Sequence, residues 1–133
     1  KLYIGGPQVR LKQEWILGVG GVRVLRALGV EPAAWHANEG HAAFMMVERV
    51  RELTARGTSF DDAVKEVRAH SVFTTHTPVP ARHDTFSFED LARCSGSIWD
   101  QLGVNRETFF RIGAHPTEEP GRFHMTVAAL RLS

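Results

Sequence analysis

The fold class is indicated most clearly by residues 33–41, whose sequence is AAWHANEGH. The first part of this stretch, 33–36, is short and apolar, which is typical of a buried strand. Asn38 is a residue type that caps helices, so we expect a helix to begin near Glu39. That helix would turn a set of apolar side chains inward at helical spacing, namely Phe44, Met46, Val47 and Val50.

The segments on either side of this stretch also have regular patterns. Before it, apolar residues recur at steps of three and four, and Gly29 is suited to end the helix that they predict. Those residues are Leu11, Trp15, Val19, Val22, Leu25 and Leu28. After it, Ser59 and Asp62 have the spacing of a capping box and predict a further helix. Residues 71–75 are β-branched and aromatic, so we expect a second strand there, and the prolines that follow would end it.

The last third of the chain is predicted to be mostly helical. We expect a loop over 81–86, helices beginning at Ser87 and Asn105, a loop over 115–122 and a final helix over 123–133. Strands that alternate with helices favour a parallel α/β sheet. Two strands cannot form a covered parallel sheet alone, so we expect further strands in a longer chain or a second copy. Open strand edges also predict that the isolated chain self-associates as a homo-oligomer.

Composition limits the possible partners. The 133 residues fit one domain or part of one, with 43% hydrophobic and 23% charged residues. Sixteen basic and 15 acidic residues give a formal charge of +1, which argues against a nucleic-acid or membrane-surface partner. A single cysteine, Cys94, excludes an intrachain disulfide framework and is typical of a reducing cytoplasm. The sequence begins with Lys1 rather than Met, and we expect it to be a piece of a larger protein.

Two polar clusters follow the expected strands. One contains Asn38, Glu39 and His41, and the other covers Thr74–Pro78. Open α/β sheets bind ligands at the carboxyl ends of their strands, and these side chains can bond to sugar hydroxyls. Two structural alternatives stay open: a helix cap in which Glu39 complements the helix dipole, and a turn whose hydroxyls bond locally.

Other chemistries find less support in the sequence. His36, Glu39, His41 and His76 are metal-ligand types, but the helical spacing of zinc motifs is absent, so we predict no metal site. The glycines in 18–21 do not match a nucleotide-binding fingerprint, and they predict close helix packing instead. Cys94 has no activating neighbour in sequence, which predicts an inert thiol.

Five motifs in order make the chain similar to the α-glucan (glycogen/maltodextrin) phosphorylases. They are VRLKQE at 9–14, LGVGGVR at 17–23, HANEGHAAF at 36–44, VFTTHTPVPA at 72–81 and FHMTVAALRLS at 123–133. The resemblance covers nearly the whole chain and is closest to the bacterial and archaeal maltodextrin-type enzymes. It implies an α/β fold, part of a GT-B (Rossmann-like) domain with parallel strands covered by helices. Residues 1–133 would then be an internal fragment of the N-terminal catalytic half.

The resemblance also implies an activity for the parent protein. These enzymes use inorganic phosphate to release the terminal glucose of an α-1,4-glucan as glucose 1-phosphate. Their pyridoxal phosphate is bound by a lysine of the C-terminal domain, and no part of this chain resembles that domain. The implied partners are therefore glucan, phosphate and the C-terminal domain of the same protein, and the isolated chain is expected to be inactive.

Site residues carry over from the family only on the sugar side. The resemblance implies that His76 is catalytic: it contacts the glucose at the cleavage point, and its backbone carbonyl faces the developing positive charge. Glu39 and His41 would lie beside the glucose, with Asn38 and Thr75 positioning these groups.

The chain departs from the family pattern in three places, and two other activities stay open. Residues 5–8 are one residue shorter than the family's stretch, Arg82 replaces a usual glycine, and His124 replaces a usual asparagine. The alternatives are a sugar-nucleotide-dependent GT-B glycosyltransferase and a non-catalytic glucan-binding module.

Overall fold

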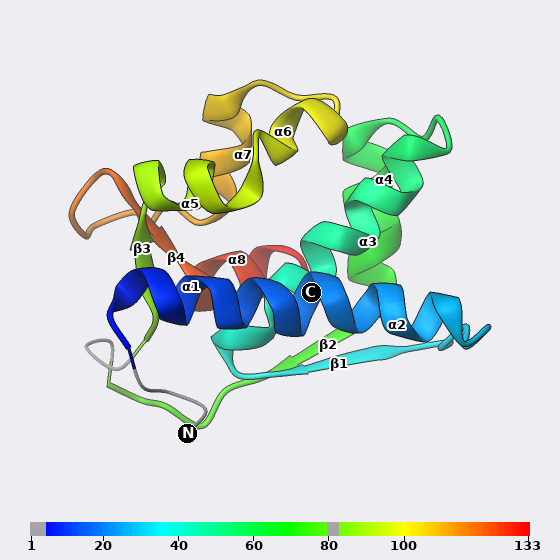
Figure 1. Ribbon diagram of the computed structural model, residues 1–133, viewed down its shortest axis with the longest axis horizontal. Helices are drawn as coiled ribbons and strands as arrows, with labels where there is room; N and C mark the ends of the chain where they lie inside the picture. Colours follow the sequence, from blue (N-terminus) through cyan, green and yellow to red (C-terminus); the bar gives the residue numbers. More distant parts are fainter. Residues whose placement is uncertain (1–4, 80–82) are drawn as a thin grey trace.

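A computed structural model describes residues 5–79 and 83–133 (Figure 1). The described chain opens with a continuous helical rod: α1 (Pro7–Trp15), the π-helical η1 (Ile16–Gly20) and α2 (Gly21–Ala27). The predicted helical face is confirmed at Leu11, Val19 and Val22, which are buried, whereas Leu28 is exposed. Gly29 follows the rod with a positive φ of 70°, as a residue that ends a helix often does.

A parallel pair of strands lies beside the rod. β1 (Trp35–Asn38) pairs with β2 (Ser71–Thr74), in a register that places Asn38 opposite Thr74. The predicted first strand is thus two residues too early in the chain. The crossover between β1 and β2 contains the 3₁₀ turn η2 (Gly40–Ala42), α3 (Phe44–Ala55) and α4 (Phe60–Ala69).

One face of the parallel pair is covered by helices. Trp35 and Ala37 of β1 are buried, whereas His36, Asn38 and Val72 are exposed. Side chains alternate between the faces of a strand, so the buried and exposed sets lie on opposite faces. Figure 1 shows the rod and the crossover helices on the same side of the pair. The expectation of an α/β fold with parallel strands is confirmed, with one face covered by the part of the chain that is described.

A second sheet was not expected from the sequence. β3 (Thr85–Ser87) pairs antiparallel with β4 (Arg122–His124), and α8 (Met125–Arg131) follows at once. The predicted loop over 81–86 and helix over 123–133 are therefore wrong at their β-strand residues, while 81 and 82 lie outside the described residues. Strands of three residues are too short for a periodic pattern, and this pairing joins residues far apart in sequence.

The remaining helices are α5 (Phe88–Ser95), α6 (Ile98–Gln101) and α7 (Arg106–Ile112). Of these, α5 packs against both strands of this second sheet, α7 contacts it through Phe109 and Phe123, and α6 lies between α3 and α7. Three predicted caps are confirmed, because the side chains of Ser59, Ser87 and Asn105 each accept a hydrogen bond from the backbone three residues on. The core that joins all parts includes Phe44, Phe109 and Phe123. Among the described residues, no helix has the length and apolar character needed to cross a membrane.

Candidate functional site

The two predicted polar clusters meet at the carboxyl ends of β1 and β2. The backbone N–H of Glu39 donates to the carbonyl of Thr74 at 2.8 Å, which extends the pairing one residue past β1. Parallel strands end at the same edge of a sheet, so the residues after Asn38 and after Thr74 are neighbours. The structure thereby brings Glu39, Thr75 and His76 together.

The carboxylate of Glu39 holds the loop that follows β2. Its Oε1 accepts from the backbone N–H of His76 and, at 3.3 Å, from the hydroxyl of Thr77. Its Oε2 accepts from the hydroxyl of Thr75 at 3.1 Å. These donors, the His76 N–H most of all, lower the pKa of Glu39 and keep it ionised. Thr77 was not among the predicted site residues, although it lies within the predicted polar cluster.

Glu39 has an unusual backbone conformation, with φ 66° and ψ 162°. This region of backbone space is populated almost only by glycine and costs other residues about 1–3 kcal/mol. The next residue, Gly40, is packed so closely that a Cβ would lie 2.7 Å from the hydroxyl of Thr126. The close contact between Gly40 and α8 thus fixes the sharp turn after β1. This turn directs the Glu39 carboxylate towards the loop that follows β2.

Asn38 lies in β1 and does not cap a helix. Its side-chain oxygen accepts from the hydroxyl of Thr74 at 3.3 Å, and Nε2 of His36 lies 2.9 Å from the same hydroxyl. The predicted cap is wrong because the chain turns at Glu39 and forms a 3₁₀ turn before α3 begins at Phe44. Asn38 instead joins the two strands on their exposed face.

His41 lies in η2 and is half-buried. Its burial lowers the pKa of the imidazole, and the positive charge of Arg10 lowers it further against the opposing effects of Asp84 and Glu39. A neutral imidazole carries one donor and one acceptor nitrogen, which suits a neutral hydroxyl-bearing ligand. The charge of Glu39 acts on His41, so these two residues of the predicted polar cluster lie near each other in the fold.

A group of three charged residues beside His41 was missed at the sequence level. Arg10 donates to Glu14 at 2.7 Å and to Asp84 at 2.7 Å. One guanidinium cannot neutralise two carboxylates, and Glu14 is 2% exposed. Burial, followed by the neighbouring Asp84, raises the pKa of Glu14 to about 8. The spacing of four between Arg10 and Glu14 could have indicated their pair, but Asp84 is 74 residues further along the chain.

His76 and His124 occupy different surroundings. The imidazole of His76 is exposed, and its loop is also held by His83, whose Nε2 lies 2.8 Å from the carbonyl of Thr77. His124 is buried in β4, with Nδ1 3.3 Å from Glu118 and its ring 5.1 Å from that of His115. Burial lowers the pKa of His124. Both of these contacts of the His124 ring thus lie in the 115–121 loop. Arg82 lies outside the described residues.

The carboxylate and imidazoles near these loops are not arranged as a metal site in the described part of the chain. Across residues 5–79 and 83–133, no group of three or more His, Cys, Asp or Glu side chains is arranged to hold a metal ion. The site consists instead of hydroxyls, an ionised carboxylate and imidazoles. This set of donors and acceptors is suited to binding a polar ligand through hydrogen bonds.

Fold and site together define an α/β protein with a polar cluster at the carboxyl ends of parallel strands, where open α/β sheets bind their ligands. No protein-family model matches the chain. Comparison with curated proteins gives the family, and by sequence the chain belongs to the glycogen and maltodextrin phosphorylases.

Three relatives illustrate the match. The maltodextrin phosphorylase of Thermococcus litoralis is 39% identical over 132 residues, which is 99% of this chain and 15% of that protein. The glycogen phosphorylase of Mycobacterium tuberculosis is 44% identical over 146 residues, covering 100% of this chain and 17% of the relative. The glycogen phosphorylase of Aquifex aeolicus is 31% identical over 133 residues, which cover 100% of this chain and 19% of that protein. The chain thus spans less than a fifth of the length of each of these relatives.

Proposed function

We propose that this chain forms the glucose-binding part of a glucan phosphorylase active site. In the parent protein, the terminal glucose of an α-1,4-glucan would be transferred to inorganic phosphate to give glucose 1-phosphate. The observation that carries the proposal is the Glu39 carboxylate, which holds the backbone of His76 next to the end of β1. Its relatives include a maltodextrin phosphorylase and a glycogen phosphorylase, which supports the same reaction class.

The proposed roles are those that the family resemblance implies for these positions. His76 would contact the glucose at the cleavage point, and its carbonyl dipole would face the positive charge that develops on the sugar. Glu39 would hold that loop, with Thr75 as a second attachment. His41 and Asn38 would bond to glucose hydroxyls or orient the groups that do. Preorganised dipoles of this kind stabilise a transition state because they need no reorganisation during the reaction.

The cofactor implied by the family does not fit the described residues of this chain. A Schiff-base lysine must reach the active site, but Lys12 and Lys65 are exposed side chains on α1 and α4. Neither is among the contacts of the strand-end cluster. This chain is therefore not proposed to hold pyridoxal phosphate. Residues 1–133 would belong to an N-terminal GT-B domain, and a C-terminal domain would supply the cofactor and the phosphate site.

The direct test is a reaction assay on the full-length protein that carries this chain. With a maltooligosaccharide and inorganic phosphate, we expect release of glucose 1-phosphate. His76→Ala keeps the backbone carbonyl but removes the imidazole that would contact the glucose, and it should reduce kcat/KM about 100-fold or more, as loss of a preorganised hydrogen-bonding group does. His115→Ala is the matched control, because His115 lies in the 115–121 loop, and it should retain activity.

Two outcomes would contradict the proposal. Glucan elongation from a sugar nucleotide, without phosphorolysis, would assign the protein to the glycosyltransferases. Tight maltooligosaccharide binding with neither reaction would favour a non-catalytic module. The isolated chain should release no glucose 1-phosphate, because it would contribute only the sugar side of the cleft.

A further inference from the structure

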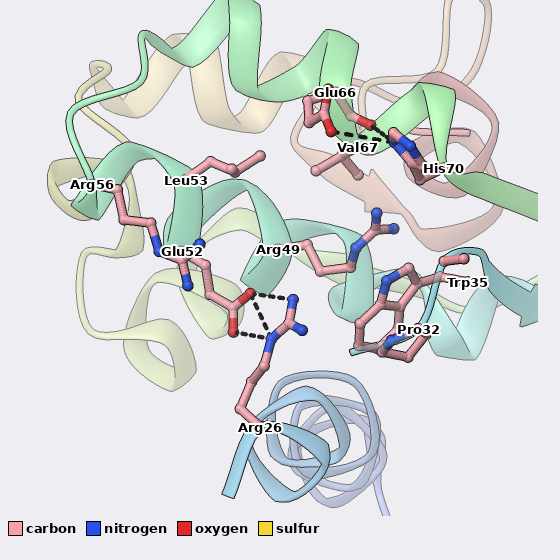
Figure 2. A pocket seen from close by; sticks show the side chains of 11 residues that line it. Arg26, Pro32, Trp35, Arg49, Glu52, Leu53, Arg56, Glu66, Val67 and His70 are labelled. Atoms are coloured by element: carbon pink, nitrogen blue, oxygen red, sulfur yellow. Dashed lines mark hydrogen bonds and ion pairs between the residues drawn. The ribbon is translucent and has the colours of Figure 1, made fainter. Parts of the chain in front are cut away.

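A cavity lies at the other ends of the two parallel strands, away from the polar cluster. Trp35 begins β1 and His70 directly precedes β2, and both line a cavity of about 300 Å³. Arg26 reaches it from α2, and Arg49 and Arg56 reach it from α3 and its C-terminal end. Figure 2 shows three guanidinium groups around this space. It is separate from the strand-end cluster of Glu39 and His76.

The carboxylates that line this cavity already have side-chain partners on the chain. Glu52 forms two-pronged bonds with Arg26, at 3.1 to 3.3 Å. Glu66 lies 3.4 Å from Nδ1 of His70. Figure 2 shows the Arg26–Glu52 pair and the Glu66–His70 pair on different sides of Arg49. Arg26 is therefore paired with Glu52 and Glu66 lies beside an imidazole, while neither carboxylate forms an ion pair with Arg49 or Arg56.

Arg49 is a buried cation, with 7% of its surface exposed. Its Nη1 donates to the hydroxyl of Ser71 at 2.6 Å, and its guanidinium carbon lies 4.9 Å from the centre of the Trp35 ring. Within residues 5–79 and 83–133, no carboxylate forms an ion pair with Arg49 or Arg56. Burial, together with the charge of Arg26, lowers the pKa of Arg49 to about 10 against the opposing charges of Glu52 and Glu66. A buried charge without a counter-ion costs free energy, which a bound anion would recover.

We propose that this cavity binds a phosphate group, carried by a small phosphate monoester or present as free phosphate. The planar guanidinium fork matches the oxygen spacing of phosphate, and arginine clusters are typical of phosphate sites. Arg49 would supply the buried contact, and the exposed Arg56 would cover the group from the rim. The inference does not depend on phosphorolysis, since the cavity lies at the far ends of the strands.

Tryptophan emission provides a local readout. The chain has three tryptophans, and Trp15→Phe with Trp99→Phe leaves Trp35 as the reporter in the cavity. The complete 133-residue chain would be titrated at constant ionic strength with inorganic phosphate, and separately with glycerol phosphate. We expect a saturable change in Trp35 emission with both, and the lower Kd identifies free phosphate or a monoester as the better ligand. Acetate, a carboxylate anion, should give no saturable change.

Substitutions connect the signal to the two unmatched arginines. Arg49→Gln should raise the Kd about tenfold or more, as loss of a charge-assisted hydrogen bond does. Because Arg49 is buried, Arg56→Gln is the second variant: Arg56 is exposed, its replacement leaves packing intact, and the Kd should still rise several-fold. Arg111→Gln is the control, since Arg111 is an exposed arginine paired with Glu107 on α7. Its Kd should match that of the parent.

Three results would overturn the assignment. The first is a lack of saturable emission change with either phosphate compound in a chain whose circular dichroism shows it to be folded. The second is an unchanged Kd in Arg56→Gln and in folded Arg49→Gln. The third is equal binding of acetate, which would make the cavity a general anion site without preference for phosphate.

Discussion

At the residue scale, Glu39 combines two properties that oppose each other. Its backbone adopts φ 66° and ψ 162°, a conformation that favours glycine, while its carboxylate accepts hydrogen bonds from Thr75, His76 and Thr77. A glycine would remove the backbone strain, but it could not hold the β2 loop. Strained residues that persist in this way are concentrated at functional sites, which agrees with the role proposed for Glu39.

Two substitutions at this position separate strain from function. Glu39→Gly and Glu39→Ala both remove the carboxylate, but only glycine relieves the positive φ. We expect the glycine variant to be more stable than the alanine variant by about 1–2 kcal/mol, and both to lose most glucan phosphorolysis. Urea unfolding gives the first comparison, and glucose 1-phosphate release by the full-length protein gives the second. Equal stability of the two variants would contradict the backbone argument.

Glu14 predicts a pH dependence of stability. Its folded-state pKa is raised from 4.5 to about 8, chiefly by burial. Between these values the folded chain binds more protons at Glu14 than the unfolded chain, so stability should fall as pH rises through this window. Glu14→Gln imitates the protonated form and removes this titration. We expect the variant and the parent to have similar unfolding free energies near pH 5, and the variant to be the more stable of the two near pH 9.

Urea unfolding at pH 5, 7 and 9 measures this effect. The control is Glu107→Gln, because Glu107 is an exposed glutamate on α7 whose pair with Arg111 lies at the surface. The difference in unfolding free energy between this variant and the parent should stay nearly constant with pH, since exposed ion pairs contribute little to stability. A parent chain whose advantage over Glu14→Gln grows as pH rises would show that Arg10 keeps Glu14 ionised in the fold.

At the element scale, the rod from α1 to α2 depends on one close approach. A Cβ at Gly18 would lie 2.6 Å from the backbone nitrogen of Met45 and 2.7 Å from Cβ of Phe44, so η1 packs directly on the start of α3. The π-helical geometry of η1 occurs at this contact. The sequence predicts close helix packing from the glycines at 18–21, and Gly18 is the one that requires it.

Two alanine substitutions in the rod should have opposite effects. Gly18→Ala forces a side chain into the backbone of α3, and we expect it to destabilise the fold by about 1–3 kcal/mol, as overpacking does. Gly21→Ala adds a Cβ that meets no atom within 4 Å, and it should stabilise the helix by up to about 1 kcal/mol. Thermal unfolding of both variants checks the pair. A tolerated Gly18→Ala would show that α3 can move away from the rod.

Helices could be predicted from this sequence more reliably than strands. The caps at Ser59, Ser87 and Asn105 are local, since each side chain bonds three residues on, and the structure confirms them. β3 and β4 depend on pairing across the whole segment between Phe86 and Phe123, and three residues carry no period. The candidate site shows the same contrast between local and long-range features. Local clusters predict Glu39 and His76, but only the fold brings Asp84 to Arg10.

At the scale of the whole molecule, an apolar surface is left open beside β1. Leu17 and Val24 of the rod line a cavity of about 700 Å³ together with Trp35 and Met45. Leu28 is exposed nearby at the end of α2. Each strand of the parallel pair also has one edge without a strand partner in the part of the chain that is described. Exposed apolar patches next to open strand edges favour association.

We therefore expect the isolated chain to self-associate through this surface, with an average mass that rises with concentration in analytical ultracentrifugation. Val24→Lys should shift the equilibrium towards the monomer, because a lysine in the apolar groove loses its hydration when the surface is covered. Leu130→Lys is the matched control: Leu130 on α8 has the same 57% exposure as Val24 but lies outside the groove. If both variants associate equally, the contact lies elsewhere. If only Val24→Lys stays monomeric, the groove beside β1 is the surface that another segment must cover.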